Sequence, residues 1–348
     1  MNTLPERSRV RLPDISSRAY EHPADRSALV ALRKLTGFDV ILRNLAGLFD
    51  DRALRLGFLA SSVRVSDQQF AHINQMLLDG AYVLDLPTVP ELYVVQDSMV
   101  NAMALGKNRP FIVLTTGLVN LMDAEELRFV IGHELGHVLS GHSVYRTMLF
   151  HLIRLAGRLG LNPIAWIGLR AVIWGLEEWF RKSELSCDRA GLLAAQDIPA
   201  ARRALMKLAG GPYLGDLSAD AFLEQAREYD AVPDVRESLI KLLQLEGQTH
   251  PFAVVRFAEL DRWSSEGEYT NILAGQYPRR EQDSDTSVGA EFRSAAKSYQ
   301  DSWNRSADPL IGAVRGVAGS AVGAGERLMN RFGRRDDGGN GGDSDSDG

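Results

Sequence analysis

Two histidines and a glutamate make up the part of this sequence best suited to chemistry, in the run His133-Glu134-Leu135-Gly136-His137. Residues four positions apart on a helix lie on one face, one turn apart, so the imidazoles of His133 and His137 can bind one metal ion. Glu134 follows His133 by about 100° around the helix, which places its carboxylate where it can take a proton from metal-bound water. The run therefore predicts two metal ligands and a general base.

The surrounding residues predict a buried helix over 123–140. Asp123 can cap this helix, with Glu126 as its partner in a capping box. Apolar residues recur at helical spacing, at Leu127, Val130, Ile131, Leu135 and Val138. Such a stripe would bury the helix in a core. Gly132 and Gly136 each weaken a helix by roughly 1 kcal/mol relative to alanine, and we interpret them as positions of close approach by another backbone or a substrate.

A catalytic zinc site usually has three protein ligands and one position for water, so a third ligand is required. Glu184 and Asp188 would share one helix face. Glu184 could bind the metal while Asp188 accepts a hydrogen bond from the far nitrogen of a ligating histidine. An ordinary solvated acidic face is an equally good interpretation of this pair, and Glu177 and Glu178 are competing ligands. His142 falls about 140° away from the ligand face, so we expect it beside the site or toward solvent.

Three further residues of reactive types are interpreted as structural. We expect His72 on the surface and His151 partly buried with a hydrogen-bonding partner. Cys187 is the single cysteine and cannot form an intramolecular disulfide. It is expected to be a small buried apolar residue and not a redox switch.

The elements that must position these residues follow from periodicity. β-Branched and aromatic runs at 91–95 and 111–115, with a shorter run at 102–105, predict strands directly before the central helix. An exposed edge of such a small sheet would let an extended peptide pair with it. Helical spacing of apolar residues predicts further helices over 24–35, 38–48, 65–78, 176–196, 200–208, 219–229, 235–245 and 252–263.

Composition is that of a soluble globular protein, with 348 residues, 45% hydrophobic and 24% charged. The formal net charge is −6, and five aspartates in the last thirteen residues account for most of it. The nearly neutral remainder gives no indication of nucleic-acid binding. The N-terminus lacks the apolar core of a secretory signal, so we expect a cytoplasmic protein.

Two segments suggest contact with a membrane surface. Residues 148–180 are rich in Leu, Ile and Trp, but their longest uncharged run, 159–169, is too short to span a bilayer. We interpret them as a buried or interfacial helical hairpin broken near Pro163. Residues 308–332 keep apolar residues at roughly helical spacing, which fits either an amphipathic docking helix or disorder.

Five features occur in an order that resembles the zinc metallopeptidases called gluzincins, specifically the family of the heat-shock protease HtpX and the type I CAAX prenyl proteases. They are the Asn-Ala run at 101–106, the strand and turn at 111–118, the HELGH helix, the E-x-x-x-D element at 184–188 and Thr-His-Pro at 249–251. The resemblance covers roughly residues 85–265. Family members with transmembrane spans differ from this chain, whose apolar insertion is interrupted by charges.

The resemblance implies one Zn²⁺ per chain, bound by His133, His137 and Glu184. It implies Glu134 as the general base and Asp188 as the carboxylate behind a ligating histidine. Asn101 matches the asparagine of an edge strand in this family, and His250 matches the histidine near the scissile carbonyl.

We therefore expect an α+β, mostly helical zincin-like metallopeptidase with a small β-sheet packed beside the HExxH helix. The domains are an arm over 1–40, a peptidase domain over 41–277 with an apolar helical insertion at 143–180, and a glycine-rich acidic tail over 278–348.

The expected function is zinc-dependent endopeptidase cleavage of extended or misfolded protein segments. The alternative is a catalytically latent metal-binding scaffold or chaperone-like protein, its site occluded by the insertion. Retention of Glu134 favours the enzyme, because a structural zinc site needs no base. An aminopeptidase ranks last, since no acidic pocket for a free amine is indicated. The sequence leaves the oligomeric state open.

Overall fold

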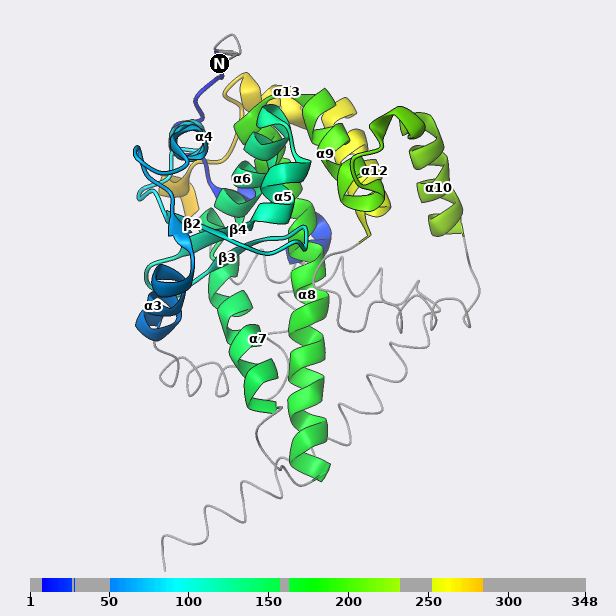
Figure 1. Ribbon diagram of the computed structural model, residues 1–348. Coiled ribbons are helices and arrows are strands. Elements are labelled where there is room, and N and C mark those ends of the chain that lie inside the picture. The colour runs from blue at the N-terminus through cyan, green and yellow to red at the C-terminus, as the bar shows by residue number, and fades with distance from the viewer. Residues whose placement is uncertain (1–7, 27, 29–50, 157–162, 232–251, 284–348) are drawn as a thin grey trace, which may run out of the picture.

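The computed structural model describes residues 8–26, 28, 51–156, 163–231 and 252–283. The predicted helices at 38–48 and 235–245 lie outside these ranges, as do most of the one at 24–35, the segment 308–332 and His250. The described part has the predicted α+β architecture: it is mostly helical, with one four-stranded sheet against the helices (Figure 1).

The sheet consists of β1 (Val63–Arg64), β2 (Glu91–Val95), β3 (Ala102–Leu105) and β4 (Phe111–Thr115), in the order β1-β2-β4-β3. β2 and β4 are parallel, and the other two pairs are antiparallel. The three predicted strands are confirmed. β1 was not predicted, because two residues are too few to show alternation. β3 lies at one edge of the sheet.

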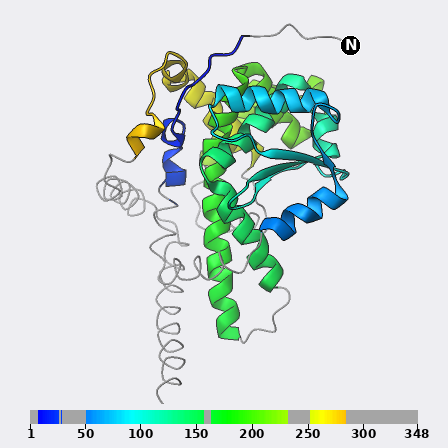
Figure 2. The same cartoon turned by 90° about the vertical axis from the view of Figure 1, so that its left-hand side faces the viewer.

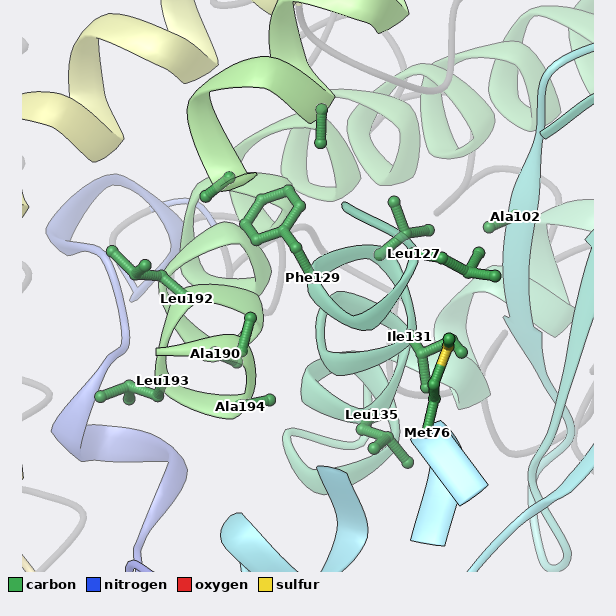
Figure 3. Packing of buried hydrophobic residues seen from close by; sticks show 14 of the residues in the cluster. Met76, Ala102, Leu127, Phe129, Ile131, Leu135, Ala190, Leu192, Leu193 and Ala194 are labelled. Carbon is green, nitrogen blue, oxygen red and sulfur yellow. The ribbon is translucent and has the colours of Figure 1, made fainter. Parts of the chain in front are cut away.

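The central helix is α6 (Ala124–Leu139), whose capping box forms as predicted. Asp123 accepts hydrogen bonds from the amides of Glu125 and Glu126, and the Glu126 side chain accepts one from the Asp123 amide. Its apolar face packs into the main core beside Met76 of helix α4 (Ala71–Val83) and Ala102 of β3 (Figure 3).

The two glycines of α6 let α8 (Pro163–Ala195) approach closely. A β-carbon at Gly132 would lie 2.5 Å from Cβ of Ala194, and one at Gly136 would lie 2.6 Å from Cβ of Ala190. Both separations are far below van der Waals contact. The predicted close approach is confirmed, and the partner at both positions is α8.

α7 (His142–Ala156) and α8 pack together and extend beyond the sheet (Figure 1). α8 begins at Pro163, which fits the predicted break. It then continues as one helix through the predicted element at 176–196. Among the residues that the structure describes, no helix is both long and apolar enough to cross a membrane.

The remaining helices cover the end of the core formed by α6 and α8. They are α9 (Ile198–Gly210), α10 (Ala219–Ala231), α12 (Ala253–Ser265) and α13 (Glu268–Leu273), with 3-10 turns at Leu214–Asp216 and Arg280–Asp283. The predictions for α9, α10 and α12 are confirmed to within two residues at each end. α12 packs against both α8 and α9.

Four helices differ from the sequence prediction. α5 (Thr116–Leu121) follows β4 where a turn was predicted, and α13 was not predicted. α4 (Ala71–Val83) begins six residues later than predicted, because Phe70 adopts a left-handed φ of 52° and Ser66 forms a turn with Gln69. α3 (Asp51–Ser61) was not predicted. Its apolar residues pack against the outer face of the sheet, so tertiary contacts stabilise a helix with no buried stripe.

An N-terminal arm, residues 8–26, lies along the core in mostly irregular conformation, with a 3-10 turn at Ser17–Ala19. Leu12, Ile15 and Tyr20 of the arm are fully buried. The Leu12 amide donates to the Val83 carbonyl, and the Arg280 guanidinium donates to Asp14. Figure 2 shows the arm beside the segment around residue 280, on the side of α8 away from the sheet. The arm is thus part of the packed structure.

Candidate metal centre

Two helices bring three potential ligand atoms together. Nε2 of His133 lies 3.2 Å from Nε2 of His137, and these two nitrogens lie 3.3 Å and 3.1 Å from the carboxylate oxygens of Glu184. A tetrahedral zinc site with bonds of about 2.0–2.1 Å has ligand–ligand edges of about 3.3–3.4 Å. The three side chains are buried and close enough to hold one metal ion. The structure thus brings together all three sequence-predicted ligands.

The packing of α6 against α8 produces this convergence. The histidines are one turn apart on α6, as the spacing requires. Gly136, next to His137, lets α8 approach to contact distance, and Glu184 is presented from there into the site. Glu177 is also buried on α8, but it belongs to neither group of metal-ligating side chains found in the described part of the chain.

Asp188 orients one of the histidines. Its Oδ1 lies 3.0 Å from Nδ1 of His133, on the side of the ring opposite the ligand atom. This is the predicted arrangement of a carboxylate behind a ligating histidine. Such a contact fixes the tautomer of the ring and raises its basicity.

Arg256 of α12 completes this part of the site and was not found by sequence reasoning. It donates two hydrogen bonds to Asp188, of 2.8 and 2.6 Å, and its Nη1 lies 3.6 Å from Glu184. Burial alone would raise the pKa of Asp188, but the charge and hydrogen bonds of Arg256, together with those of His133, outweigh burial and lower that pKa. In the sequence, the only indication for Arg256 is its position on the core-facing side of the predicted helix at 252–263. That position does not indicate that Asp188 is its partner.

Burial and the nearby carboxylates act in opposite directions on the two histidines. Burial disfavours the charged imidazolium at both. At His133, the charge of Glu184 and the bond to Asp188 outweigh burial and raise the pKa to about 9. At His137, burial dominates and lowers the pKa to about 4. These opposite shifts favour a proton on His133 over one on His137.

Glu134 is buried beside the two histidines, with an exposed fraction of 1%. Its Oε2 accepts no hydrogen bond from any residue that the structure describes, and the nearest ion-pair partner, Nη1 of Arg146, is 4.0 Å away. A buried carboxylate oxygen in this state is costly unless a ligand satisfies it. The site therefore suits a bound group that brings a proton.

His142 lies in a second layer behind His137. Gly141, with φ of 72°, ends α6, and α7 begins at His142, so the chain turns back toward the site and does not continue as one helix. The two Nδ1 atoms of His137 and His142 are 3.3 Å apart, and Sγ of Cys187 is 3.5 Å from the latter. His142 is therefore beside the site, and Cys187 is buried as predicted, with its pKa raised by burial.

The other candidate residues are placed as follows. Asn101 is half-buried directly before β3, where its backbone N–H donates to the Thr115 hydroxyl. The catalytic role of its side chain stays a prediction. His72 is exposed, as predicted, and His151 is half-buried. The Glu178 side chain and His250 lie outside the described part, so their predicted roles also stay predictions.

Comparison with known proteins gives a consistent result. The family model described as "Peptidase family M48" matches residues 67–264. The chain is 36% identical over 265 residues to the plastoglobule-localized metallopeptidase 48, chloroplastic, of Arabidopsis thaliana, which covers 75% of this chain and 76% of that protein.

Two bacterial or archaeal relatives are named as homologues of the protease HtpX. That of Streptococcus gordonii is 40% identical over 77 residues, 22% of this chain and 26% of that protein. HtpX homolog 2 of Methanosarcina mazei is 25% identical over 231 residues, 58% of this chain and 76% of that protein. No solved structure matches the chain significantly.

Proposed function

Because this chain belongs to peptidase family M48, we propose that it is a zinc-dependent endopeptidase that cleaves extended or misfolded protein segments. Membership makes it a metallopeptidase. The observation that carries the finer proposal is the group of three buried ligand atoms, His133 Nε2, His137 Nε2 and a Glu184 carboxylate oxygen. Beside them lies Oε2 of Glu134, which accepts no hydrogen bond from the described residues.

Two histidines and one carboxylate are the ligand set of a catalytic zinc site, which leaves a position for water. His133, His137 and Glu184 would hold the zinc ion there, and the ion would supply a water of pKa near about 7 and a positive charge beside the substrate carbonyl. Glu134 accepts the proton of the attacking water and delivers it to the leaving amine. Asp188, held by Arg256, keeps the His133 ring oriented.

The edge of the sheet supports an extended substrate. β3 is an edge strand that packs against α6 and α7, so a peptide lying along its free edge would pass near the site. Asn101 at the start of β3 and His250 would donate hydrogen bonds to the oxyanion formed during attack. One such donor typically lowers the activation free energy by around 3 kcal/mol.

Association with a membrane surface is part of the proposal. The Arabidopsis relative is named as plastoglobule-localized. In this chain, Phe150 and Ile153 of α7 expose 36% and 46% of their surface. We propose a cytoplasmic enzyme that contacts lipid peripherally through residues 148–180 or 308–332. Flotation of the full chain with anionic vesicles, compared with a Phe150→Ser, Ile153→Ser variant, tests the first of these segments.

Metal analysis combined with peptide cleavage tests the chemistry. The parent and Glu134→Gln should each contain one zinc ion per chain, and only the parent should cleave casein or an unfolded reporter. Chelation should abolish cleavage, and added zinc should restore it. Zinc in both proteins with cleavage in neither would favour the latent scaffold. A purified protein that binds no zinc would overturn the proposal.

A further inference from the structure

Building on the metal site of the proposed function, we propose that Asp25 of the N-terminal arm and His142 of α7 are positioning residues for the metal. Together they hold His137 in the tautomer whose Nε2 lone pair faces the metal.

The geometry assigns the ring protons in the row of contacts from Asp25 through His142 to His137. Nε2 of His137 faces His133 and Glu184, where the proposed function has it bind the metal through its lone pair. A neutral imidazole that binds a metal through Nε2 carries its ring proton on Nδ1. That nitrogen, Nδ1, lies 3.3 Å from Nδ1 of His142. One of the two nitrogens must donate and the other accept, because two lone pairs or two protons facing each other would repel.

Asp25 decides which nitrogen of His142 is protonated. Oδ2 of Asp25 lies 3.5 Å from Nε2 of His142. An ionised carboxylate only accepts hydrogen bonds, so it favours the proton on Nε2 of His142. Nδ1 of His142 is then an acceptor, and Nδ1–H of His137 donates to it. The thiol of Cys187, 3.5 Å from the same nitrogen, can donate a weak hydrogen bond to it and is compatible with that acceptor role.

The Asp25 side chain is held firmly in this position. It is buried, with an exposed fraction of 1%, and Oγ of Ser186 donates a 2.6 Å hydrogen bond to it. Ser186 lies on α8 between Glu184 and Asp188, and its hydroxyl also accepts a bond from the His22 amide. The arm therefore docks on the segment of α8 that supplies the third ligand.

The two metal-facing histidines are then oriented in different ways. His133 faces the carboxylate of Asp188 directly at 3.0 Å. His137 faces a carboxylate only through an intervening imidazole. His137, His142 and Cys187 are also close enough together to hold a cation of their own. However, His137 would then have to lose both ring protons to bind two ions, whereas the Asp25 contact explains the arrangement with neutral rings.

The test measures the zinc dissociation constant of the full chain by competition with a chelator of known affinity. Loss of a group that orients a metal ligand typically weakens metal binding about 10–100-fold. We expect a loss in that range for His142→Leu. His142→Asn places an amide oxygen near the position of Nδ1, so it should bind zinc within about threefold of the parent. Asp25→Leu should weaken binding in the same direction as His142→Leu.

Tyr20→Phe is the matched control for arm docking, because it removes the arm's contact with the Ser140 hydroxyl at 3.1 Å and leaves the row of contacts to His137 intact. Its zinc affinity should equal that of the parent. Equal affinity in His142→Leu and the parent, or equal losses in His142→Leu and His142→Asn, would overturn the inference. Two zinc ions in the parent and one in His142→Leu would also overturn it, because His142 would then be a ligand.

Circular dichroism of the metal-free variants separates weak binding from misfolding. If His142→Leu does not fold, the comparison of Asp25→Leu with Tyr20→Phe decides. A parent that binds zinc and cleaves peptide, with unaffected variants, refutes only this inference. A parent that binds no zinc refutes the proposed function itself.

Discussion

Each half of α6 buries a glutamate, and the two carboxylates differ in the hydrogen bonds that they accept. Glu126 at the start of the helix is fully buried and saturated with partners. It accepts from Nε of Arg203 at 3.0 Å, Nζ of Lys207 at 2.7 Å and the Asp123 amide at 2.8 Å. Glu134, eight residues later, is almost equally buried, yet its Oε2 accepts nothing from the described residues.

The difference separates a structural charge from a functional one. A buried carboxylate surrounded by donors stabilises the fold, and removing it leaves buried cations without a partner. A buried carboxylate that lacks a donor weakens the fold, and the protein retains it only for a reaction or a ligand. Burial by itself therefore does not distinguish Glu134, the proposed general base, from Glu126, whereas the hydrogen bonds that their carboxylate oxygens accept do.

The largest expected effect is on activity, at Glu134. Replacing it by glutamine should lower kcat/KM for peptide cleavage by about 10²–10⁴-fold, because a general base contributes about that much. The free energy of unfolding should be unchanged or raised, since an unsatisfied charge is removed. Peptide hydrolysis and urea denaturation measure the two quantities. A Glu134→Gln protein that is both active and less stable would break the comparison.

Arg256 should show that the catalytic end also contains a structural pair. Arg256→Ala leaves the buried Asp188 carboxylate without its cation, which should lower the free energy of unfolding by about 3–5 kcal/mol. Arg256→Lys restores the charge without the two-bond geometry and should recover part of that loss. Denaturation of the metal-free protein measures both. Equal stability of the alanine variant and the parent would mean that the pair contributes nothing.

Glu126 is the matched counterpart of Glu134. Glu126→Gln removes the charge from a fully buried carboxylate that pairs with the largely buried Lys207 and the more exposed Arg203, and it should cost about 2–3 kcal/mol of stability. The folded fraction should cleave peptide with the kcat/KM of the parent, because the residue is two helical turns from the site. A stable but inactive Glu126→Gln would contradict the division of roles along α6.

Asp85 shows how much stability a partly buried carboxylate contributes, for comparison with the two buried glutamates. It accepts from the Asp14 amide and from Arg11 and Arg280, and these contacts hold its pKa below the usual range. Asp85→Asn should cost about 1 kcal/mol at neutral pH. The stabilisation is fully present above the ordinary pKa of about 3.9 and is lost as the pH falls through the lowered value. In acid denaturation the difference between parent and variant should therefore begin to shrink below about pH 4 and vanish below the lowered pKa of Asp85. A difference that persists there would exclude this origin.

Much of the site could be predicted from local spacing. The two α6 ligands, the base between them and the capping box depend on contacts within five residues of sequence, which the helical repeat fixes. The strands β2, β3 and β4 also follow from local pattern. α4 could not be delimited in this way, because the left-handed Phe70 that delays its start leaves no periodic signal.

The sequence by itself determined which residues on α6 can bind a metal and move a proton, because the geometry of one helix sets their relative positions. Only the tertiary structure decided that Glu184 meets the histidines, that Arg256 neutralises Asp188 and that Asp25 reaches His142. These pairs join residues far apart in the chain. Their meeting depends on how closely helices pack and where turns redirect the chain, and no local repeat encodes either.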